Sequence, residues 1–160
     1  MQMSMKYPID IRKAIYASVV PVRCDNERGT AFFIAPDTLV TARHIVAQNA
    51  VNGVPVFIST DKQVLCDVEY IAEEGVNVDV VMLRCKDYQQ EDYLKLLAAE
   101  FNEDRQLTIV GYPKEFGNCS DIISMEVQDR LGNRKEDYDT TVVRTDSLAF
   151  TSYKGFSGSP

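Results

Sequence analysis

The chain has 160 residues and a formal net charge of −7, with 45% hydrophobic and 26% charged residues. This composition is ordinary for a soluble globular protein with a sizeable core, and it excludes an intrinsically disordered chain. The acidity, with positive residues scattered as at Arg130, Arg134 and Lys135, argues against a protein that binds nucleic acid by neutralising phosphates.

The first part of the chain has the pattern of a small all-β unit. A helical turn is expected at residues 9–16, and short apolar runs rich in Val, Ile, Phe and Thr then alternate with turn residues. Turns such as Asn52-Gly53 separate the runs. Six strands within about 65 residues are expected to close into one barrel. They are predicted at residues 19–24, 29–35, 38–42, 54–60, 63–72 and 78–85.

The pattern changes after the sixth strand. Residues 87–92 are polar, and residues 93–101 have helical spacing, which indicates a linker between two β units. Strands are then predicted again at residues 106–111, 121–128 and 138–145. A hairpin turn at Leu131-Gly132-Asn133 lies between the last two. The predicted organisation is a helical turn and first barrel in 1–86, a linker in 87–105 and a partial second barrel in 106–160.

The second unit is short. Only three strands are predicted before the sequence stops at Pro160, whereas a second six-stranded barrel would need more chain. We therefore expect this chain to be a fragment of a longer protein. The rest of the second barrel would follow Pro160, and an additional C-terminal domain is possible after it.

Location and redox state follow from what the sequence lacks. No stretch approaches the roughly 20 apolar residues of a membrane-spanning helix, and residues 1–13 lack the apolar core of a signal peptide. We therefore expect a cytoplasmic protein without a membrane partner. The cysteines form no C-x-x-C pair and have no companion histidines for zinc. Four cysteines could form two disulfides, but we expect them to be reduced thiols that lie mostly in strands. They are Cys24, Cys66, Cys85 and Cys119.

Three segments carry residues suited to nucleophilic catalysis: 39–46 with His44, 78–83 with Asp79, and 155–160 with Ser157. A serine hydroxyl needs a base within hydrogen-bond reach, and histidine ionises near neutral pH. A carboxylate can fix the imidazole tautomer, and a glycine-rich turn can direct backbone N–H groups at an oxyanion. Taken singly, each also has a structural interpretation: a core histidine, a turn-capping aspartate at a strand start, and a surface turn. However, an aspartate at the start of the apolar run 80–83 would be partly desolvated and would need a partner. Their combination in this order is more specific.

The same segments resemble the motifs of trypsin-like serine proteases. Residues 41–44 (TARH) resemble T-A-x-H, residues 79–83 (DVVML) resemble D-[IV]-A-[LV]-L, and residues 155–160 (GFSGSP) resemble G-[DN]-S-G-[GS]-P. The strand 29–34 (GTAFFI) and the segment 110–113 (VGYP) resemble the bacterial, HtrA-like members. Phe156, Ser159 and Val81 depart from the usual residues of these motifs.

This resemblance implies an all-β, chymotrypsin-like double β-barrel whose second barrel is truncated after the nucleophile loop. It implies His44 as general base and acid, Asp79 as its orienting carboxylate and Ser157 as nucleophile, with the N–H groups of Gly155 and Ser157 as oxyanion hole. Thr151 would lie near the base of the specificity pocket, where the lack of a carboxylate disfavours Arg or Lys in the substrate. Protein or peptide substrates are implied, and no cofactor or metal.

Two other functions stay open. An α/β-hydrolase also presents a serine in a Gly-x-Ser-x-Gly elbow, but here the fifth position is Ser159, and the chain order is His, Asp, Ser without βαβ alternation. A catalytically inactive trypsin-like domain that serves as a binding or regulatory module is the stronger alternative, because a fold does not by itself establish an activity. The complete set of His44, Asp79 and Ser157 favours a serine endopeptidase.

Overall fold

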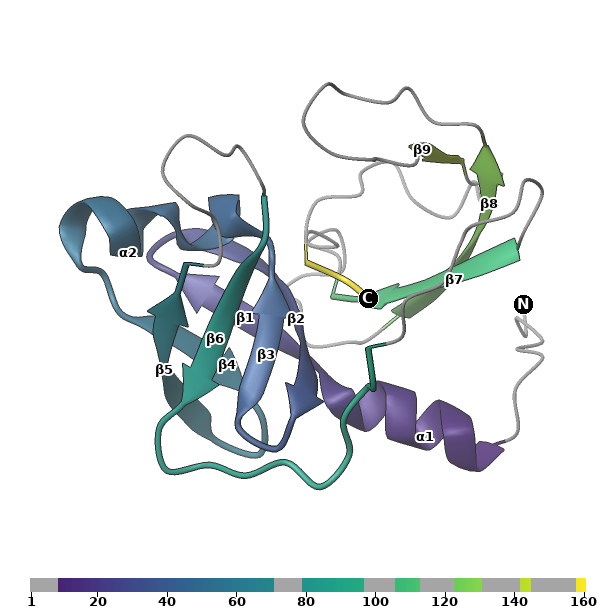
Figure 1. The fold of residues 1–160 in the computed structure, drawn as a ribbon, viewed down its shortest axis with the longest axis horizontal. Coiled ribbons are helices and arrows are strands. Elements are labelled where there is room, and N and C mark those ends of the chain that lie inside the picture. Colours follow the sequence, from purple (N-terminus) through teal and green to yellow (C-terminus); the bar gives the residue numbers. More distant parts are fainter. Residues whose placement is uncertain (1–8, 71–78, 97–105, 113–122, 131–141, 145–157) are drawn as a thin grey trace.

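The computed structural model describes residues 9–70, 79–96, 106–112, 123–130, 142–144 and 158–160 (Figure 1). Strands dominate this part of the chain, which confirms the predicted all-β class. Helix α1 (Ile9–Ser18) precedes the first strand, where the sequence predicted a helical turn. Among the helices of the described residues, none combines the length and apolar character that crossing a membrane requires.

The first six strands form the predicted closed barrel, in the order β1-β2-β3-β6-β5-β4 with antiparallel pairing throughout. Closure leaves no unpaired strand edge. The strands are β1 (Val19–Cys24), β2 (Glu27–Ala35), β3 (Thr38–Thr41), β4 (Val56–Ser59), β5 (Gln63–Glu69) and β6 (Val81–Cys85).

Alternating burial along the strands fills the barrel interior. In β5, Val64 and Cys66 point inward while their neighbours are exposed. The largest fully buried side chains come from four different strands, and each contributes about 1.5–3 kcal/mol of burial free energy. They are Phe33, Leu39, Ile58 and Leu83.

Two short helical segments separate β3 from β4, and the sequence analysis did not predict them. They are the 3-10 helix η1 (Arg43–Val46) and helix α2 (Ala47–Asn52). Ile45 and Val46 of η1 are buried in the barrel core. Helix α2 ends at Gly53, whose φ of 66° is left-handed and whose N–H donates to the carbonyl of Asn49 at 2.9 Å. A helix of this length has too few residues to show a hydrophobic period, and none of its side chains is buried. Its C-terminal cap and Asn49 Nδ2, which donates to the carbonyl of Val54 at 2.9 Å, hold it in place.

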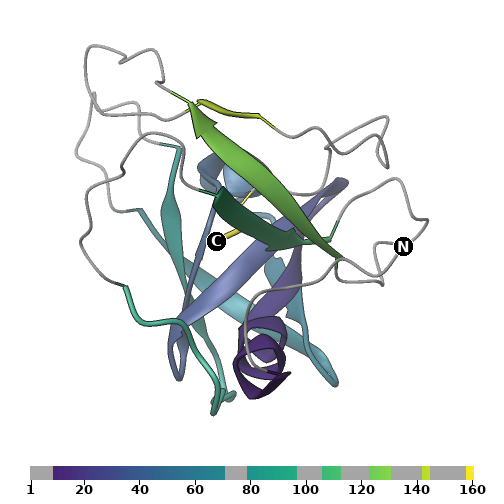
Figure 2. The same cartoon turned by 90° about the vertical axis from the view of Figure 1, so that its right-hand side faces the viewer.

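The second sheet contains β7 (Gln106–Gly111), β8 (Ile123–Arg130) and β9 (Val142–Arg144), in that order and antiparallel. Figures 1 and 2 show this sheet beside the barrel. Tyr112, directly after β7, attaches it there. Its backbone N–H donates to Thr30 Oγ1 at 3.0 Å, and its hydroxyl donates to the carbonyl of Val19 at 3.1 Å.

The segment after β6, residues 86–96, contacts the barrel through its backbone. The N–H groups of Gln90 and Leu94 donate to the carbonyls of Pro36 and Phe33 at 2.7 and 2.8 Å. The sequence predicted helical spacing at residues 93–101, but residues 93–96 do not form a helix. Their backbone makes hydrogen bonds with the barrel instead. Residues 97–101 lie outside the described part, and the predicted domain boundaries stay predictions.

Candidate active site

His44 and Asp79 meet at one end of the barrel. His44 Nδ1 lies 2.7 Å from Asp79 Oδ2, and the backbone N–H of His44 donates to Asp79 Oδ1 at 2.9 Å. The N–H of Arg43 also donates to the backbone carbonyl of Asp79, at 3.3 Å. Both carboxylate oxygens therefore hold the same residue. A proton on Nδ1 satisfies this contact and leaves Nε2 free to accept one.

Strand pairing explains why two residues 35 positions apart in the sequence come together. Thr41, the last residue of β3, pairs with Val81, the first residue of β6. Because the strands are antiparallel, the end of one and the start of the other share an edge of the barrel. His44 follows Thr41 by three residues and Asp79 precedes Val81 by two, so both lie at this edge.

The pair is open to solvent. The side chains of His44 and Asp79 are 53% and 54% exposed. The sequence analysis expected a partly desolvated aspartate, and about half of the Asp79 side chain is covered. Water screens the attraction between an imidazolium and a carboxylate at such a site. The pair would therefore become electrostatically stronger when a bound polypeptide covers it.

Gly158 lies against the strand that leads to His44. Its φ is 85°, and a Cβ built on it would overlap the carbonyl oxygen of Thr30 and lie 2.9 Å from the backbone nitrogen of Ala42. A side chain has no room here, so only glycine fits. Gly158 is bonded to Ser157, and Ala42 precedes His44 by two residues. The contact therefore brings the end of the chain to the segment that carries the histidine.

The remaining predicted site residues, Ser157, Gly155 and Thr151, lie outside the described residues. The structure adds three that the sequence analysis did not single out. Thr41 Oγ1 donates to the carbonyl of Thr30 at 2.8 Å inside the barrel, and Thr30 Oγ1 accepts from Tyr112. Thr30 belongs to the GTAFFI strand, Thr41 to the TARH motif and Tyr112 to the VGYP segment, so the motifs held a signal for all three.

The cysteines lie in barrel strands. Cys24, Cys66 and Cys85 are buried free thiols in β1, β5 and β6, and Cys119 lies outside the described residues. Cys66 and Cys85 are direct cross-strand partners with their sulfur atoms 4.0 Å apart. Burial raises the pKa of the Cys24 thiol, while the hydrogen bond with Cys85, and then burial, raise the pKa of Cys66. Within the described ranges, no group of three metal-binding side chains is gathered for an ion.

The family profile described as a trypsin-like peptidase domain matches residues 29–160. The fold is similar to the active form of the Rv3671c protease from M. tuberculosis, with 22% identity and a TM-score of 0.68 over 94% of this chain and 66% of that chain. It is also similar to the serine protease of human pathogenic astrovirus, with 17% identity and a TM-score of 0.62 over 90% of this chain and 74% of that chain.

A third similar structure is Deg5, with 13% identity and a TM-score of 0.67 over 98% of this chain and 81% of that chain. No curated protein matches significantly by sequence. At these identities the structural likeness establishes the fold, and it confirms the chymotrypsin-like architecture predicted from the sequence.

Proposed function

The chain belongs to the trypsin-like peptidase family of hydrolases, and we propose that it is a serine endopeptidase with His44, Asp79 and Ser157 as its catalytic triad. The observation that carries the proposal is the 2.7 Å contact between His44 Nδ1 and Asp79 Oδ2. His44 is the only histidine of the chain. Gly158, packed against Ala42, supports the assignment of the preceding serine as nucleophile.

In the proposed reaction, Ser157 Oγ attacks the carbonyl carbon of the scissile peptide while His44 Nε2 takes the hydroxyl proton. The backbone N–H groups of Gly155 and Ser157 donate to the oxyanion of the tetrahedral intermediate. His44 then gives its proton to the leaving amine, and an acyl-enzyme remains on Ser157. Water, deprotonated by His44, attacks this ester. The bond between Ser157 Oγ and the acyl carbon then breaks, His44 returns the proton to Oγ, and the new carboxyl end is released.

Asp79 has two tasks in this scheme. It keeps the proton on Nδ1, so that Nε2 faces the serine as a base, and its negative charge stabilises the imidazolium that forms during each transfer. The two hydrogen bonds from His44 to opposite oxygens of one carboxylate suit the first task, because they fix both the backbone and the ring. We also propose that the neutral Thr151 makes cleavage after Arg or Lys slow.

A fluorophosphonate probe tests the nucleophile, because it forms a stable bond with an activated serine oxygen. The wild-type protein is expected to be labelled once, and Ser157→Ala should abolish labelling. Ser159→Ala is the matched control. Ser159 Oγ is buried and has no hydrogen-bond partner among the described residues, so its removal should leave labelling unchanged. Equal labelling of wild type and Ser157→Ala would overturn the assignment, and an unlabelled wild type would favour the inactive binding module.

A further inference from the structure

Two arginines lie directly opposite each other on the outer surface of the barrel. Arg23 of β1 pairs with Arg28 of β2, and on its other side Arg23 pairs with Phe57 of β4. The three side chains therefore follow one another across three neighbouring strands. Like charges directly opposite on a sheet repel each other. A negative charge close to both guanidinium groups would relieve this repulsion.

The chain does not supply that charge within the part that the structure describes. The ion pairs found there use Arg84, Lys86 and His44, and neither Arg23 nor Arg28 takes part. Carboxylates are plentiful, since the net charge is −7. The acidic residues of the adjoining turn region, Asp25 and Glu27, are not among those that line the surface beside the arginines.

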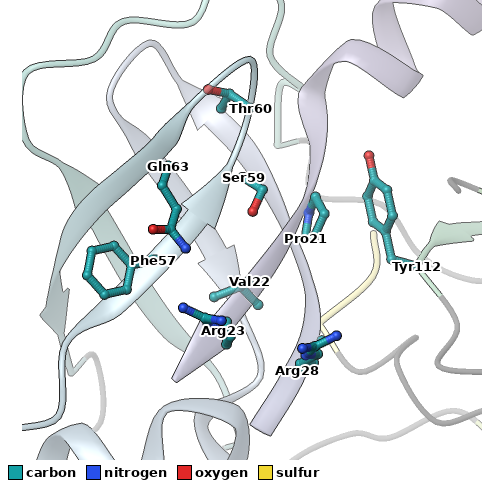
Figure 3. Close-up of a pocket in the computed structure, with 10 residues that line it drawn as sticks. Pro21, Val22, Arg23, Arg28, Phe57, Ser59, Thr60, Gln63 and Tyr112 are labelled. Atoms are coloured by element: carbon teal, nitrogen blue, oxygen red, sulfur yellow. The ribbon is translucent and has the colours of Figure 1, made fainter. Parts of the chain in front are cut away.

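This surface is a pocket of about 560 Å³ (Figure 3). Both arginines lie at one end and Thr60 at the other, with Pro21 between them and Tyr112 at one side. The lining combines two cations with polar groups that can donate hydrogen bonds and with two aromatic rings. These are Arg23, Arg28, Ser59, Thr60, Gln63, Phe57 and Tyr112.

The pocket adjoins the candidate active site. Gly29 lines it, and the next residue, Thr30, presents its carbonyl oxygen to Gly158. Tyr112, which also lines the pocket, donates to Thr30 Oγ1. Arg28 precedes Thr30 by two residues in β2, and successive residues in a strand are about 3.3 Å apart, so a few residues of extended polypeptide would reach from Gly158 to the arginines.

We propose that this pocket binds an acidic side chain, Asp or Glu, of the polypeptide substrate, a proposal that rests on the proposed protease function. The carboxylate accepts hydrogen bonds from the guanidinium groups of Arg23 and Arg28 and relieves their repulsion. The methylene groups of the same side chain pack beside Phe57. The protein thereby selects substrates with a negative charge at a fixed distance from the cleaved bond.

Binding is tested without catalysis, with fluorescein-labelled hexaglutamate and hexaglutamine peptides in an anisotropy titration. Wild-type protein is expected to bind hexaglutamate about tenfold more tightly, and the difference should shrink as the salt is raised from about 0.05 to about 0.5 M. The Arg23→Gln/Arg28→Gln double variant should bind both peptides within about twofold. Lys13→Gln on helix α1 removes one positive charge away from the pocket and should keep the preference.

A thermal melt shows that the double variant is folded, and because it removes two opposed like charges, its melting temperature should be equal or higher. Arg23→Lys/Arg28→Lys keeps the charges and should retain part of the preference. Equal binding of both peptides by the wild type would overturn the proposal. An equal loss in Lys13→Gln would also do so, because it would indicate a general charge effect.

Cleavage of a peptide library then locates the preference. Wild-type products are expected to be enriched in Asp or Glu at one position relative to the cut, and the double variant should lose that enrichment while it still cleaves. If the wild type cleaves nothing, the protease function fails, and the anisotropy result alone decides whether the pocket binds carboxylates. A wild type that cleaves without acidic enrichment contradicts the substrate role of the pocket.

Discussion

Replacing Gly158 with alanine tests how the end of the chain fits against the barrel. At a φ of 85° an alanine is strained by about 1–2 kcal/mol. Its Cβ would also collide with the Thr30 carbonyl, a backbone atom of the paired strand β2, and crowd the Thr41 hydroxyl and the Ala42 nitrogen directly after β3. Overpacking of this kind costs about 1–3 kcal/mol. Together these two costs give an expected loss of about 2–5 kcal/mol.

Gly53→Ala is the matched control. Gly53 also has a positive φ, 66°, but a Cβ there would meet nothing within 4 Å. The control therefore carries the backbone strain alone, about 1 kcal/mol. Urea unfolding gives both losses, and fluorophosphonate labelling shows whether the nucleophile has moved. Gly158→Ala should label far more slowly than Gly53→Ala. Equal stability and equal labelling of the two variants would refute the packing described for Gly158.

Two further changes test the site and the barrel core. Asp79→Asn should slow turnover by about 10⁴, because the amide favours the wrong imidazole tautomer; this is the loss known for the same replacement in another Ser-His-Asp protease. Asp37→Asn is the control and should have no such effect. A loss below about tenfold in Asp79→Asn would mean that Asp79 has only a structural role. Because burial raises the pKa of the Cys24 thiol, the contribution of this thiol to the unfolding free energy should be constant below about pH 8.5 and fall above it. Urea titrations across this range check it, and an increase would contradict it.

The sequence predicts the barrel well because each strand alternates inward and outward residues between clear turn signals. The bounds of β1 and β7 agree with the predicted ranges, while β4 and β6 begin two and three residues later than predicted. At the start of β6 the reason is local. Asp79 accepts hydrogen bonds from Arg43 and His44 instead of pairing with a strand. The motif therefore interrupts the strand pattern where the chemistry is expected.

Other features depend on contacts between distant residues and have no local signature. Helix α2 is too short for a hydrophobic period, and the expected helix after residue 92 is replaced over residues 93–96 by contact with β2. The opposed arginines become visible only through the register of β1 and β2. The closeness of His44 to Asp79 was predicted by motif resemblance, and strand pairing gives its physical cause. The position of Ser157 relative to them stays a prediction.

The attachment of residues 86–96 has a mechanical consequence. This segment connects the barrel to the second sheet, and it is hydrogen-bonded to the barrel by the backbone of Gln90 and Leu94 and by the side chain of Gln90, which donates to the carbonyl of Ala17 at 2.9 Å. A free tether would let the sheet swing about a hinge. Because residues 86–96 are fixed at these points, a pull on this segment would load its hydrogen bonds to Ala17 of α1 and Phe33 of β2 first.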